Sequence, residues 1–176
     1  PMPNAPTGWT DDLTEFHEEV SGGQHPIDSA SLSLAVEAVD RHVPAGGRVL
    51  EIGCSGGHLI RQLRRERPEL LVEGADIINH PLKRLARELR DEGLPTPILQ
   101  FDLTSCPLPD ETYDAVVALN VLEHIEDHRK AVAEAGRILK PNGDFIFEAP
   151  AGSALYEDHD RELPHYRRYD APGLPE

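Results

Sequence analysis

Short apolar runs alternate with amphipathic segments of helical length along most of this 176-residue chain. A chain with this alternation forms βαβ units, whose crossovers make the strands parallel and place helices on the faces of the sheet. The apolar runs predict strands at residues 49–52, 70–76, 97–101, 113–119 and 144–149. We therefore expect an α/β fold with a doubly wound, mostly parallel, Rossmann-like sheet.

The segments between these strands carry the spacing of buried helix faces. Five apolar side chains between Leu32 and Val43 follow one another at helical intervals. Comparable faces predict helices around residues 59–63, 82–89 and 131–139. The run Lys140-Pro141-Asn142-Gly143 predicts a turn before the last strand.

Composition and charge exclude several classes of protein. The chain has 17 basic and 32 acidic residues, a formal charge of −15, and such a surface repels nucleic acids and anionic membranes. Its two cysteines have no metal-binding spacing and favour a reducing compartment. We find no apolar run long enough for a membrane span and no signal-peptide pattern, so we expect a cytoplasmic protein.

A turn rich in small residues, 53–57, follows the first strand and leads into a helix at His58. Few side chains in a turn let the backbone approach a ligand closely, and the helix N-terminus offers unpaired N–H groups. Polar residues also end the next three strands: Asp76, Asp102 and Asn120. Ligands of open parallel sheets bind at this edge, and an acid about 20 residues beyond the loop suits a ribose diol.

Several motifs in order resemble the class I S-adenosylmethionine-dependent methyltransferases, in particular the small-molecule branch of types 11 and 23. The resemblance covers roughly residues 30–150. The matching segments are 49–57, 101–103, 107–110, 113–116, 120–125 and 139–143. Ser55 and Asn142 stand where the family usually has glycine, and both residue types tolerate a turn.

The resemblance implies S-adenosyl-L-methionine as the cofactor and gives roles to the residues of the strand ends. Glu51 would orient the methionine part, Asp76 would hold the ribose hydroxyls, and Asp102 would accept from the adenine amino group. Asn120 and Val121 would lie along the sulfonium end. The complete predicted cofactor set is Glu51, Gly53, Cys54, Ser55, Gly57, Asp76, Ile77, Asp102, Leu103, Asn120 and Val121.

Two histidines, His124 and His165, are candidate general bases, because imidazole titrates near neutral pH. The alternative is structural: His124 caps or packs, and the Arg-Tyr run of residues 165–169 braces the loop by stacking and ion pairs. The acids and histidine of residues 158–160 match no standard metal spacing, so we predict no metal site.

Three regions are expected along the chain. Residues 1–27 form an N-terminal arm or lid with a short helix at 10–20, residues 28–150 form the cofactor-binding domain, and residues 151–176 form a polar segment on the acceptor side. Sheets of the family usually have seven strands, so we expect the last two to be missing from this chain.

The predicted function is methyl transfer to an oxygen, nitrogen or carbon nucleophile of a small-molecule acceptor. One alternative is a non-catalytic, methyltransferase-like subunit that binds a partner. Another is a nicotinamide-dependent oxidoreductase, whose GxGxxG turn would need glycine at Ser55 and at His58.

Overall fold

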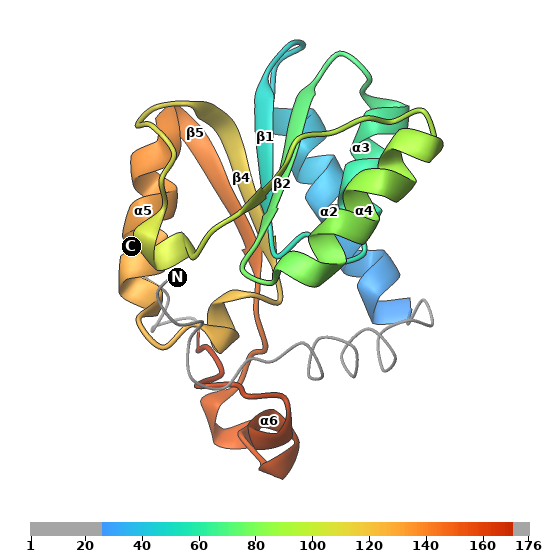
Figure 1. Ribbon diagram of the computed structural model, residues 1–176. Coiled ribbons are helices and arrows are strands. Elements are labelled where there is room, and N and C mark those ends of the chain that lie inside the picture. The colour runs from blue at the N-terminus through green and yellow to red at the C-terminus, as the bar shows by residue number, and fades with distance from the viewer. Residues whose placement is uncertain (1–25, 171–176) are drawn as a thin grey trace.

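The computed structural model describes residues 26–170 and contains one sheet of five parallel strands (Figure 1). The order across the sheet is β3-β2-β1-β4-β5, which confirms the predicted fold class. The strands are β1 (Arg48–Ile52), β2 (Leu71–Asp76), β3 (Ile98–Gln100), β4 (Tyr113–Leu119) and β5 (Leu139–Glu148). The helix predicted at residues 10–20 lies outside the described residues.

Helices cover both faces of this sheet. In Figure 1, α2 (Pro26–His42), α3 (His58–Glu66) and α4 (Asn79–Asp91) lie on one side, and α5 (His128–Ile138) lies on the other. Each side has its own buried apolar cluster, so the side chains of β4 are covered from both directions. This explains why β4 is apolar at nearly every position. Within residues 26–170, no helix has the length and apolar character that crossing a membrane requires.

Short helical turns follow the strands at the carboxyl edge of the sheet. These are η1 (Leu103–Ser105) after β3, η2 (Leu122–His124) after β4, and η3 (Ser153–Leu155) and α6 (Asp158–Glu162) after β5. The chain then returns and forms a bridge between Ala151 and Tyr169. Residues 149–170 therefore lie beyond the strand ends, as Figure 1 shows.

The turn predicted at residues 140–143 is part of β5 instead. Tyr113 pairs with Leu139 and Ala115 with Asp144, so residues 140–143 form an irregularity in the ladder. Asn142 has a φ of +66° there, and Lys140 forms an ion pair of 2.8 Å with Asp114 of β4. The turn residues bend the backbone as expected, but pairing with β4 starts before the bend.

Candidate cofactor site at the carboxyl edge of the sheet

The register of the strands brings the predicted cofactor residues to one edge. Ile52 of β1 pairs with Ala75 of β2 on one side and with Ala118 of β4 on the other. Asp76 and Asn120 follow these partners closely, and the loop of residues 53–57 follows Ile52. The glycine loop and the polar strand ends therefore meet at the middle of the sheet.

The loop of residues 53–57 is held against β2 by its own backbone. The N–H groups of Gly53 and Cys54 donate to the carbonyl of Ala75 at 2.8 and 3.1 Å. Gly53 has a φ of +72°, and a Cβ built on it would lie 2.4 Å from Cγ2 of Val121. Ser55, the irregular residue of the loop, also has a positive φ, of +31°. The loop thus leaves no room for a side chain at Gly53.

Asp76 connects this loop to α4. Its Oδ2 accepts from the backbone N–H of Ser55 at 3.3 Å, and its Oδ1 accepts from that of Ile78 at 3.1 Å. The neighbouring Ile77 carbonyl accepts from Gln100 at 3.1 Å. Because two backbone segments fix the carboxylate, its position does not depend on a bound ligand.

Asp102 and Asn120 have structural roles of their own at the strand ends. Asp102 caps η1, where its Oδ1 accepts from the N–H and the hydroxyl of Thr104, both at 2.8 Å. Leu103 is buried beneath it. Asn120 has a φ of +53°, a conformation that asparagine tolerates. Its backbone N–H donates to the backbone carbonyl of Glu148 at 3.0 Å.

Glu51 is a buried carboxylate beside the loop. Burial raises its pKa to about 8, against the lowering effect of a hydrogen bond from the backbone N–H of Ile60, and Asp76 raises it further. Among the described residues, its Oε2 has no hydrogen-bond partner. Burial also raises the pKa of the Cys54 thiol, so this cysteine stays protonated. A positively charged ligand group would favour the ionised form of Glu51.

The two histidines predicted from the sequence meet at the end of β4. The rings of His124 and His165 lie edge to face, with centroids 4.7 Å apart. Two buried acids accompany them that sequence reasoning did not assign to the site: Glu123 and Asp160. Glu123 adjoins His124 within the motif segment 120–125, and this position was the sequence signal that could have identified it.

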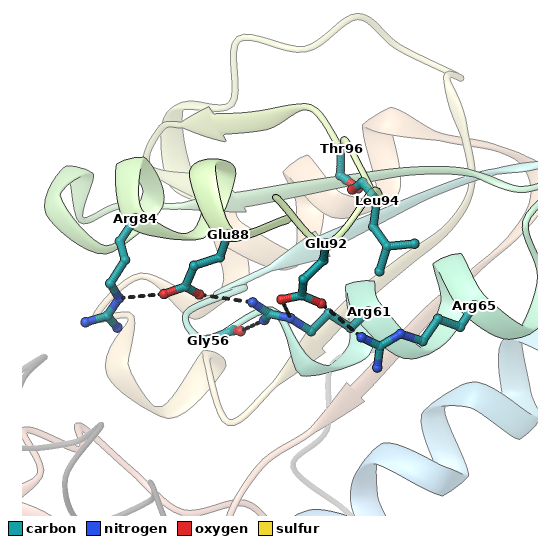
Figure 2. A network of polar contacts seen from close by, with 8 residues as sticks. All are labelled: Gly56, Arg61, Arg65, Arg84, Glu88, Glu92, Leu94 and Thr96. Carbon is teal, nitrogen blue, oxygen red and sulfur yellow. Dashed lines mark hydrogen bonds and ion pairs between the residues drawn. The ribbon is translucent and has the colours of Figure 1, made fainter. Parts of the chain in front are cut away.

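A network of ion pairs holds the loop from the α3 side (Figure 2). Arg61 of α3 donates to the carbonyl of Gly56 and pairs with Glu88 of α4 at 3.0 Å and with Glu92, the residue that caps the C-terminus of α4, at 2.7 Å. Arg65 joins the network through Glu92 at 2.9 Å. The Arg61 side chain is 17% exposed, whereas that of Arg65 is 61% exposed. Arg61 thus fixes the loop relative to both helices.

Comparison with known protein families identifies the family of this chain. The family model described as a methyltransferase domain matches residues 50–147, more than half of the chain. The chain therefore belongs to this methyltransferase family, as the motifs predicted. The family indicates S-adenosyl-L-methionine as the cofactor.

Individual relatives agree with this assignment. A dimethylglycine N-methyltransferase from Parasynechococcus marenigrum is 31% identical over 157 residues, which cover 79% of this chain and 55% of the relative. A ubiquinone biosynthesis O-methyltransferase from Photorhabdus laumondii is 30% identical over 103 residues, covering 58% and 42%. The structure of YcgJ from Bacillus subtilis has a TM-score of 0.71 at 25% identity, covering 82% and 64%. The chain thus spans about half of the length of the two sequence relatives.

The residues at the carboxyl edge fit this cofactor. Gly53 and Gly57 both have positive φ angles, and a Cβ on either would lie 2.4 Å from a packed side chain, Val121 or Leu85, so the loop requires glycine at both positions. The buried oxygen of Glu51, which has no partner among residues 26–170, suits a cationic group. The carboxylate of Asp76 is already held in place by Ser55 and Ile78.

Replacing Arg61 with methionine should weaken cofactor binding about fivefold, because one charged donor to the loop, worth ~1 kcal/mol net, is lost. The matched control is Arg65→Met, which removes a single exposed pair to Glu92 and should leave the affinity unchanged. Calorimetric titration with S-adenosyl-L-methionine measures both. Equal effects of the two changes would show that Arg61 does not position the loop.

Proposed function

We propose that this chain transfers a methyl group from S-adenosyl-L-methionine to an oxygen, nitrogen or carbon nucleophile of a small-molecule acceptor. The observation that carries the proposal is the meeting of the glycine loop, Asp76 and the end of β4 at one edge of the sheet. When bound, the cofactor supplies a methyl group already activated by its positively charged sulfur.

The chain's own residues would bind and orient the cofactor. Asp76 would accept from both ribose hydroxyls, since a carboxylate has two acceptor oxygens. Asp102 would accept from the adenine amino group, with the Leu103 backbone beside it. Glu51 would ionise opposite a positive group of the methionine part. Such a protein contributes mainly alignment and the exclusion of water.

The acceptor side would be formed by η2 and residues 151–170. His124 or His165 would take the proton of an acceptor that arrives protonated. The names of the two relatives, a dimethylglycine N-methyltransferase and a ubiquinone biosynthesis O-methyltransferase, support a small molecule as acceptor but differ in the atom methylated.

Both cysteines of the chain are free and buried, which supports the predicted cytoplasmic location.

Turnover tests this proposal directly. The full chain is incubated with S-adenosyl-L-methionine and small amines, phenols, alcohols and activated carbon acids, and mass spectrometry follows S-adenosylhomocysteine and methylated products. We expect acceptor-dependent formation of S-adenosylhomocysteine, which Asp76→Asn lowers about tenfold or more when the cofactor is below saturation. Cofactor binding without turnover for any acceptor class would favour the non-catalytic subunit. Binding of NADH in place of S-adenosyl-L-methionine would favour the oxidoreductase.

A further inference from the structure

The carboxylate of Glu123 is buried, and no residue in the described part of the chain donates a hydrogen bond to it. The residue is 1% exposed, and among residues 26–170 neither carboxylate oxygen has a hydrogen bond. An ionised carboxylate in such a place is costly unless a cation or a donor compensates it.

Two imidazoles lie next to this carboxylate. His124 follows it in η2, and the N–H of Tyr166 donates to the Glu123 carbonyl at 2.8 Å, which brings His165 alongside. One ligand atom from each of Glu123, His124 and His165 lies within 4.8 Å of the other two. Tetrahedral ligands at about 2.0–2.2 Å from a zinc ion are roughly 3.5 Å apart, so small side-chain rotations would close the site.

A second buried acid, Asp160, orients His165. The residue is 0% exposed, and its Oδ1 lies 2.9 Å from Nδ1 of His165. Arg168 donates to both oxygens of Asp160 at 2.8 and 3.0 Å, which keeps this carboxylate ionised and in place. If Nδ1 donates to Asp160, Nε2 of His165 carries the lone pair. A carboxylate behind a histidine in this way is the usual support of a metal-binding imidazole.

We propose that Glu123, His124 and His165 bind one divalent transition-metal ion of the zinc type, with Asp160 as the positioning residue behind His165. Two imidazoles and one carboxylate suit Zn²⁺, Co²⁺ or Ni²⁺ better than Mg²⁺ or Ca²⁺, which require more oxygen ligands. This proposal departs from the expectation, based on sequence spacing, that the chain has no metal site. The spacing of residues in the sequence does not indicate this metal site, because His165 is far from Glu123 in the chain.

Three protein ligands leave a fourth position for another ligand. The site lies at the same edge of the sheet as the cofactor loop, since Val121, two residues before Glu123, is in contact range of Gly53. In the metal-loaded chain, an oxygen or nitrogen of the acceptor would bind in the fourth position, and the metal would lower the pKa of that bound group. His124 and His165 would then act as ligands, and the role of general base would apply only to the metal-free chain. That use of the site rests on the proposed function, whereas metal binding itself does not.

The test is a titration of the full chain, freed of metal by a chelator, with Zn²⁺ by calorimetry and with Co²⁺ by visible absorption. We expect one equivalent of each to bind, with the absorption of a four-coordinate Co²⁺ centre. Glu123→Gln and His165→Gln should each weaken binding about 100-fold, and Asp160→Asn about tenfold. The matched control is His159→Gln, on an exposed histidine of α6 outside the cluster, which should bind as the wild type does.

X-ray absorption of the zinc-loaded wild-type chain avoids any dependence on how the variants fold. It should show two imidazole nitrogens and at least one carboxylate oxygen around the metal. Absence of one-equivalent binding, or binding that survives Glu123→Gln unchanged in a folded variant, overturns the proposal. Loss of turnover or of S-adenosyl-L-methionine binding with an intact metal titration would instead contradict the proposed function alone.

Discussion

Replacing Gly53 with alanine is expected to lower the free energy of unfolding by about 2–4 kcal/mol. The residue has a φ of +72°, which costs an alanine backbone energy, and the added Cβ would lie 2.4 Å from Cγ2 of Val121. Valine is stiff about χ1, so the loop must move instead. That movement breaks the hydrogen bonds to Ala75 and should weaken cofactor binding by about tenfold or more.

Gly46 provides the matched control for this prediction. Its φ is +78°, but a Cβ there meets nothing within 4 Å. Gly46→Ala should therefore cost only the backbone term, about 1 kcal/mol, and leave cofactor affinity unchanged. Urea denaturation and calorimetric titration measure the two effects. If both variants lose the same stability and affinity, the close approach of the loop to Val121 is unimportant.

Replacing Asp160 with asparagine should loosen the segment around α6 in metal-free protein. Asp160 is buried, accepts from Arg168 with both oxygens and lies against His165, so the change removes the negative charge and one of the two acceptor oxygens. We expect a local loss of about 2 kcal/mol, or roughly 30-fold faster amide exchange in residues 157–166. Hydrogen exchange followed by mass spectrometry measures this directly.

The same pair makes the segment sensitive to acid. The hydrogen bond from Arg168 is the largest cause that holds the pKa of Asp160 well below its usual value of 3.8. Because the folded pKa is the lower one, ionised Asp160 stabilises the segment above about pH 3.8, and this stabilisation is lost as acid protonates it in the fold. Protection in the wild type should thus fall on acidification from about pH 5, while Asp160→Asn should lack this contribution.

Asp158→Asn is the control for both measurements. Asp158 also pairs with an arginine, Arg161, but its side chain is 90% exposed. An exposed pair of this kind contributes little, so exchange and its acid dependence should match the wild type. Equal effects at positions 158 and 160 would mean that burial of Asp160 has no energetic consequence.

The meeting of the glycine loop with the polar strand ends could be predicted from the sequence because it depends on local patterns. Each strand is a short apolar run, and parallel strands end at one edge, so Asp76 and Asn120 had to lie near the glycine loop. The length of β5 could not be predicted in the same way. Its first residues look like a turn, and only their pairing with β4 makes them part of the strand.

The cluster of Glu123, His124 and His165 lay beyond sequence reasoning for a different reason. The helical elements within residues 149–170 are only short turns. Sequence patterns this short do not predict how the segment folds back against η2. The contact between His165 and η2 depends on the bridge of Ala151 with Tyr169 and on Tyr166 bonding to Glu123. Such tertiary contacts leave no periodic signal.

Calorimetric titration of the chain with S-adenosyl-L-methionine tests the central claim, that the edge around the glycine loop and Asp76 is the cofactor site. We expect one binding site, whose affinity Asp76→Asn weakens at least about tenfold, because a charged acceptor for the ribose is lost. The control Asp91→Asn, at an exposed acid of α4, should bind like the wild type. Absence of binding, or equal affinity of the Asp76→Asn variant and the wild type, would contradict the account.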